Sequence, residues 1–152
     1  MRLWHFKLLQ YLPRQQLLSQ WRECCGIAKD IAEKGTPNHI LVNKIVDYPL
    51  GMFTTYTRLV RDEMTNRGYT ITTKALGKYR SNISKCCDKL NNYNINETGS
   101  VKDLYKGWHD DTYLRQCLYN LEEKYICGGI TDEEWSKVYA AFADFTPLVK
   151  EQ

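Results

Sequence analysis

The chain has 152 residues, a length that suits one domain with its own hydrophobic core, so we expect a single domain over residues 1–152. Hydrophobic residues make up 43% and charged residues 26%, as in ordinary soluble globular proteins. The net charge of +3 permits a nucleic-acid partner without demanding one. No apolar run approaches the roughly 18 residues that a membrane-spanning helix needs.

Cysteines and histidines are the candidate metal ligands. No C-x-x-C or H-E-x-x-H spacing occurs, so the pattern argues against zinc and thioredoxin-type sites, and we expect no metal. The start of the chain lacks the apolar stretch of a signal peptide. We therefore expect a cytoplasmic protein whose cysteines are reduced and pack as small hydrophobic side chains.

The strongest helical pattern begins after Pro13, a residue tolerated in the first turn of a helix, and ends at Gly35. Apolar residues recur every three or four positions and form one stripe: Leu17, Trp21, Cys24, Ala28 and Ile31. The opposite face carries polar and small residues: Gln15, Ser19, Arg22 and Gly26. Glu23 is predicted on the shoulder between the two faces.

The rest of the chain is predicted as further helices separated by turns. We expect a helix from Thr36 to about Asp47, which Pro49 ends. Helical spacing predicts four more segments at 52–67, 75–90, 101–105 and 114–125. A capping-box pattern at 131–134 opens a last helix through about 142.

Residues 91–99 are polar and predict a loop, and 69–73 is the one candidate strand. The predicted fold class is all-α, a single compact helical domain with the N-terminal segment packed near the first long helix.

One run of the first helix is similar to a known family. Gln15-Gln-Leu-Leu-Ser-Gln-Trp-Arg-Glu23 resembles the first-helix run Gln-His-Leu-Met-Ala-Glu-Tyr-Arg-Glu of the pyrimidine dimer DNA glycosylases of the phage endonuclease V type. The start Met1-Arg-Leu-Trp4 resembles the Met-Arg-(Ile/Leu)-Trp opening of the bacterial branch. Further similarities lie at 57–71, which ends Asn-Arg-Gly-Tyr-Thr-Ile, and at 121–124.

The resemblance implies a DNA-repair glycosylase with associated AP lyase activity that needs no cofactor. In that family the N-terminal α-amine attacks C1′ of the damaged nucleotide, so the candidate nucleophile here is the Met1 amine. The glutamate that matches Glu23 stabilises the cationic sugar and removes the C2′ proton. The substrate implied is double-stranded DNA with a damaged base, contacted by family-matched positions: Arg2, Gln15, Arg22 and Lys124.

The sequence departs from the family pattern at three places. Arg2 is too large for the usual removal of the initiator methionine, so we expect Met1 to be retained. Two family arginines are replaced, one by Gly26 and one by Asn120, which leaves the lesion open between pyrimidine dimers and a related damaged base. His39, which follows Pro37 closely, is a further candidate for the DNA-facing groove.

Two other interpretations fit the same residues. On spacing alone, Arg22 and Glu23 are typical of a solvated helix face. A non-catalytic nucleic-acid-binding protein could retain the fold without using the amine. The other interpretation is a helical interaction protein with no nucleic-acid partner. The similar segments favour the enzyme.

Overall fold

Helices account for the regular structure of the residues that this computed structural model describes, 1–95 and 101–145. The elements in chain order are the 3-10 helix η1 (Phe6–Leu8), α1 (Arg14–Lys34), the 3-10 helix η2 (Asn43–Asp47), α2 (Leu50–Asn66), α3 (Thr73–Leu90), the 3-10 helix η3 (Val101–Asp103), α4 (Asp111–Ile126) and α5 (Asp132–Phe142). The all-α fold class is confirmed. In this part of the chain no helix is long and apolar enough to cross a membrane.

The long helices begin and end where the sequence signals stand. Pro13 caps the start of α1, and Gly35 ends it with φ +77°, a left-handed conformation that glycine adopts without strain. Thr131 and Glu134 form the predicted capping box of α5. The apolar stripe of α1 is buried throughout, which confirms its amphipathic assignment.

Two predictions for the segments between helices are wrong. Residues 36–42 form a loop, and only the short helix η2 follows, instead of a helix from Thr36 to Asp47. Asn38 has φ +54°, and the Asn43 side chain accepts a hydrogen bond from the His39 backbone nitrogen at 2.8 Å, so side chains satisfy the backbone in place of helical bonds. Residues 69–72 form no strand, because Thr72 already caps α3 by accepting from the Ala75 nitrogen.

The predicted loop at 91–99 is irregular as far as residue 95, and residues 96–99 lie outside the described part of the chain. The predicted helix at 101–105 is a 3-10 turn at Val101–Asp103.

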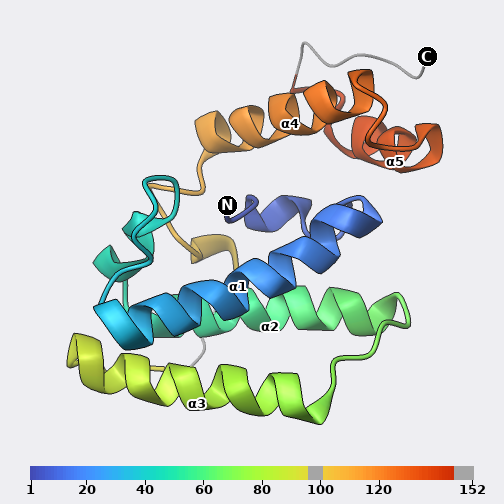
Figure 1. Ribbon diagram of the computed structural model, residues 1–152. Helices are drawn as coiled ribbons and strands as arrows, with labels where there is room; N and C mark the ends of the chain where they lie inside the picture. Colours follow the sequence, from blue (N-terminus) through green and yellow to red (C-terminus); the bar gives the residue numbers. More distant parts are fainter. Residues whose placement is uncertain (96–100, 146–152) are drawn as a thin grey trace.

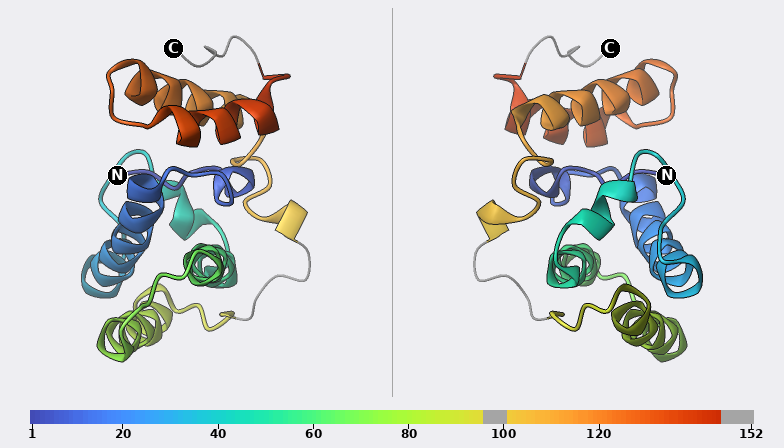
Figure 2. Two further views of the ribbon diagram at one scale, coloured as in Figure 1. Left: turned by 90° about the vertical axis from the view of Figure 1, so that its right-hand side faces the viewer. Right: turned by 90° about the vertical axis from the view of Figure 1, so that its left-hand side faces the viewer.

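The helices form two groups with the N-terminal segment between them (Figure 1). Helix α1 packs against α2 and α3. Helices α4 and α5 pair with each other on the other side of the molecule. Figure 2 shows these groups from two sides, with the start of the chain and η1 running between the α4–α5 pair and the lower three helices.

This central position explains the burial of the N-terminal segment. Five of its apolar side chains are buried, with exposed fractions of 6% or less: Leu3, Trp4, Leu8, Leu9 and Leu12. Burying a leucine side chain contributes about 2 kcal/mol, so the segment is a structural part of the core. The N-terminal segment therefore packs in the core beside α1, as predicted from the sequence.

The cysteines are all free thiols. Four of them are buried, Cys24, Cys86, Cys87 and Cys117, and burial raises the pKa of the Cys24 thiol well above its usual value. Cys25 is half-buried and Cys127 is exposed. The expected packing as small hydrophobic side chains thus holds for the four buried cysteines.

Candidate active site

The start of the chain is fixed by side chains that bond its backbone. Arg2 N donates to Glu23 Oε2 at 3.2 Å, and Arg2 O accepts from Gln20 Nε2 at 2.8 Å. Trp4 N donates to Gln20 Oε1 at 2.8 Å. Because both edges of the Gln20 amide bond the same short segment, residues 2–4 have one register against α1.

Two tyrosines complete the attachment from other helices. The Tyr56 hydroxyl, on α2, lies 2.6 Å from the Trp4 carbonyl oxygen and 2.8 Å from Gln20 Oε1, and it shares its one proton between these acceptors. The Tyr113 hydroxyl, on α4, donates to the Leu3 carbonyl at 2.5 Å. Helices α1, α2 and α4 therefore converge on the first four residues.

Gln20 was missed as a site residue, although the sequence carried a signal. It lies three residues after Leu17 and four before Cys24, so it is a polar residue on the apolar stripe of α1. The structure buries it completely, with an exposed fraction of 0%. A buried amide is stable only when its donors and acceptors are bonded, and this one bonds the chain start.

Glu23 lies beside the first peptide unit. Its Oε2 accepts from Arg2 N, and Gln20 Nε2 lies 3.4 Å from the same oxygen. The Met1 α-nitrogen is three covalent bonds from Arg2 N, about 3 Å away, so the amine lies within roughly 7 Å of Glu23 Oε2. A nucleophile and a carboxylate at this separation can both reach one sugar.

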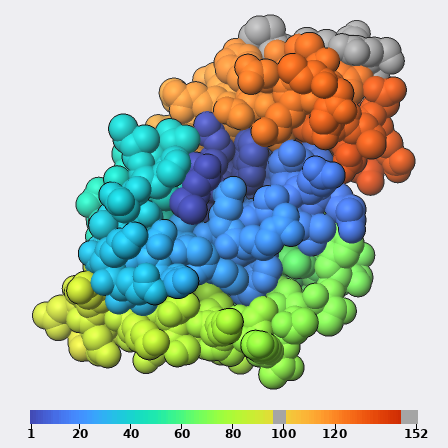
Figure 3. Space-filling model, in the orientation of Figure 1, coloured from blue at the N-terminus to red at the C-terminus, as the bar shows by residue number. Residues whose placement is uncertain are grey.

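Arg2 is held by aromatic rings. Its guanidinium carbon lies 5.7 Å from the centre of the Trp4 ring and 5.9 Å from that of Tyr113, while Nη1 lies 3.9 Å from the Cys117 sulfur. Such cation–π contacts restrict the side chain and leave it half-buried. Met1 remains 41% exposed. In Figure 3 the first residues lie in a hollow between α1, the segment after α1 and α4.

Two buried histidines, His5 of the N-terminal segment and His109, stack on each other. The rings of His5 and His109 lie 5.1 Å apart, and Phe6 N donates to His109 Nδ1 at 3.2 Å. Burial lowers the pKa of His5 to about 4 and, with repulsion from His5, that of His109 to about 2. Both imidazoles are neutral at physiological pH, so the support of the chain start is uncharged.

The other predicted DNA contacts are not equally near this site. Arg22 and Gln15 are exposed on α1, and Arg22 Nη2 donates to Ser19 Oγ at 3.1 Å. His39 is half-buried in the loop after α1, where its Nδ1 accepts from Leu41 N at 3.3 Å. Lys124 lies eleven residues beyond Tyr113 along α4, about 16 Å of helical rise, and is not brought to the chain start.

The substituted arginine position on α1 is open. Gly26 has no atom within 4 Å of the place where a side chain would begin. A side chain at position 26 would therefore begin in open space, one turn beyond Arg22.

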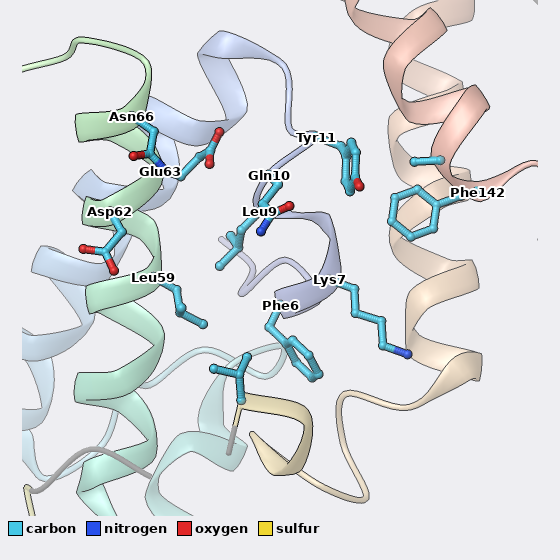
Figure 4. Close-up of a pocket in the computed structure, with 12 residues that line it drawn as sticks. Phe6, Lys7, Leu9, Gln10, Tyr11, Leu59, Asp62, Glu63, Asn66 and Phe142 are labelled. Atoms are coloured by element: carbon cyan, nitrogen blue, oxygen red, sulfur yellow. The ribbon is translucent and has the colours of Figure 1, made fainter. Parts of the chain in front are cut away.

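One cavity lies away from the chain start, between η1, α2 and α5 (Figure 4). It has a volume of about 590 Å³, and its α2 wall carries Asp62 and Glu63. These carboxylates pair with arginines of their own helix, Arg58 and Arg67. Glu23 is not part of this cavity, and neither is any of the DNA contacts predicted from the sequence. We therefore place the candidate site at the chain start, not in this cavity.

No cluster of three or more His, Cys, Asp or Glu side chains in the described residues could hold a metal ion. His109, Asp110 and Asp111 have structural positions, and Asp110 caps α4 by accepting from Tyr113 N at 2.9 Å.

The chain was compared with known protein families, curated proteins and solved structures. The family model for pyrimidine dimer DNA glycosylase matches residues 1–76, half of the chain. Comparison with curated proteins and with solved structures found no match. The matched part contains the chain start, α1, α2 and Glu23, whereas Lys124 lies outside it. The chain therefore belongs to the pyrimidine dimer DNA glycosylase family.

Proposed function

We propose that this protein removes a damaged pyrimidine from double-stranded DNA and then nicks the strand, using the Met1 α-amine and the Glu23 carboxylate. The observation that carries the proposal is the bond from Arg2 N to Glu23 Oε2, within the segment that matches the family. It places a carboxylate next to the first residue, whose α-amine is the candidate nucleophile.

The first step replaces one bond at C1′ by another. The amine nitrogen of Met1 bonds C1′ while the bond from C1′ to the base breaks, and the base leaves with the electron pair and is protonated by water. Opening of the sugar ring then gives a protonated imine between the amine and C1′. The Glu23 carboxylate stabilises the positive charge that develops on the sugar.

The second step breaks the DNA strand. Glu23 removes a proton from C2′, and the electron pair expels the 3′ phosphate, which is a β-elimination. Water hydrolyses the imine and releases the amine. Phosphate contacts from Arg22 and Arg2, with Gln15 and His39 at the edges, would hold the duplex during both steps.

The proposal is tested by trapping the imine. Borohydride reduces an imine to a stable amine, so the wild type incubated with dimer-containing or abasic duplex should become covalently joined to DNA. Glu23→Gln should lose strand nicking by at least about a hundredfold, the scale of general acid–base catalysis. Glu33→Gln removes an exposed carboxylate from the last turn of α1 and should nick normally.

Three results would contradict parts of this proposal. No adduct with either substrate would exclude the enzyme. Binding to DNA that survives Glu23→Gln, with no adduct in the wild type, would identify a non-catalytic binding protein. Equal nicking by Glu23→Gln and Glu33→Gln would remove Glu23 from the mechanism.

A further inference from the structure

The loop between α1 and η2 presents two apolar side chains to solvent. Ile40 is 86% exposed and Leu41 is 47% exposed. Other exposed large hydrophobic residues, such as Tyr93 and Ile126, are not adjacent to a second one in sequence. Single apolar residues are common at protein surfaces. Adjacent exposed apolar residues beside a candidate active site are instead typical of a surface that binds another molecule.

The loop is built to hold this tip outward. Asn43 N and Val42 N both donate to the His39 carbonyl, at 2.9 Å and 3.0 Å, and Leu41 N donates to His39 Nδ1. Val42 and Ile45, with exposed fractions of 0% and 2%, anchor the base of the loop in the core. The turn is thus closed by its own hydrogen bonds and points Ile40 away from the protein.

The tip adjoins the chain start through shared residues. A cavity of about 380 Å³ is lined by Ile40 and Leu41 on one side and by Trp108 and Tyr113 on the other. Tyr113 is also the residue that bonds the Leu3 carbonyl and faces the Arg2 guanidinium. Exposed Lys44 and Asp110 also line this cavity, so its rim carries one charge of each sign.

A reacting sugar inside a duplex is not accessible while its base pairs remain stacked. Proteins that open a base step commonly insert apolar side chains, which replace the stacking contacts that are lost. From the exposure, the closed turn and the contact with the chain start, we propose that Ile40 and Leu41 form a wedge that enters the base stack of damaged duplex DNA. This inference rests on the proposed function, because it assigns the same site a way to reach C1′.

The wedge is required only where there is a stack to open. The test compares one abasic site in two contexts, a duplex and the same strand alone, by the rate of borohydride trapping. Ile40→Ser/Leu41→Ser should lower the rate on the duplex by at least about tenfold and leave the rate on the single strand unchanged. Ile126→Ser, at the exposed end of α4, is the matched control and should trap both substrates normally.

A second measurement does not depend on catalysis. 2-Aminopurine placed next to a non-reactive tetrahydrofuran abasic analogue should brighten when the wild type binds the duplex, because unstacking relieves its quenching, and should stay dim with the double variant. Equal brightening by both proteins, or an equal loss of trapping on both substrates, would overturn the wedge. Failure of the wild type to trap any substrate, with brightening intact, would instead defeat the proposed chemistry and leave the wedge standing.

Discussion

The buried amide of Gln20 should be essential to the position of the chain start. Gln20→Met keeps the length and helix propensity of the side chain but removes both polar atoms. It leaves Trp4 N buried without its acceptor and removes the donor to the Arg2 carbonyl. Tyr56 can still donate to the Trp4 carbonyl.

The magnitude follows from these lost bonds. An unsatisfied buried N–H costs about 1–3 kcal/mol and a lost neutral hydrogen bond about 1 kcal/mol. Methionine no longer buries an amide, which offsets part of this. We expect the free energy of unfolding to fall by about 2 kcal/mol, measured by urea denaturation.

Gln16 provides the matched control on the same helix. Its Oε1 is buried without a hydrogen-bond partner, so Gln16→Met should change the free energy of unfolding by less than about 0.5 kcal/mol or increase it. Gln20→Met should also slow imine trapping, because the amine is no longer held beside Glu23. The reasoning is refuted if both methionine variants are equally stable and trap DNA at the same rate.

Three further predictions concern the support of the site and its DNA face. Burial lowers the pKa of His5 to about 4 in the folded protein, whereas the unfolded chain binds this proton near pH 6.5. The free energy of unfolding should therefore be highest above pH 6.5 and should fall as the pH drops toward 4. Equal free energies of unfolding at pH 7.5 and pH 5, measured by urea denaturation, would contradict this. The Glu134 carboxylate accepts from Arg14 N at 2.7 Å and from Thr131 N, at the start of α5, at 3.2 Å. Glu134→Ala should therefore cost about 1–2 kcal/mol of unfolding free energy, while Glu133→Ala in the same turn should cost little. Equal thermal midpoints of the two variants would disprove this double role. Gly26→Arg should tighten the binding of duplex DNA and steepen its salt dependence by about one unit of slope. Gly77→Arg, at an equally open position on α3, should stabilise its helix without changing DNA binding. Identical salt titrations of DNA binding by the two variants would exclude this face of α1 from the DNA interface.

The long helices were predictable because local signals agreed with the tertiary structure. The stripe from Leu17 to Ile31 has one period, and Pro13 and Gly35 mark its ends by backbone chemistry alone. Glu23 could be singled out because the similar family run contains it. What no local pattern contained was the partner of that carboxylate, since the contact between Glu23 and Arg2 spans 21 positions of sequence.

The predictions failed where contacts between side chains and backbone overrode the local sequence signals. Thr36-Pro37 is a valid helix start, but Asn38 in the left-handed region and the Asn43 side chain close a turn that competes with the helix. Gln20 was not singled out from the sequence, because its bonds to Arg2 and Trp4 depend on a segment that only the whole fold packs against α1. Side chains that serve distant backbone cannot be assigned from spacing.

The central claim is that the α-nitrogen of the chain start is the nucleophile, and mapping the site of attachment tests it most directly. The wild type is trapped on abasic duplex with borohydride and digested, and the modified peptide is sequenced by mass spectrometry. The account predicts that the sugar remnant lies on the α-nitrogen of Met1. Attachment to a lysine side chain, or no attachment at all, would contradict it.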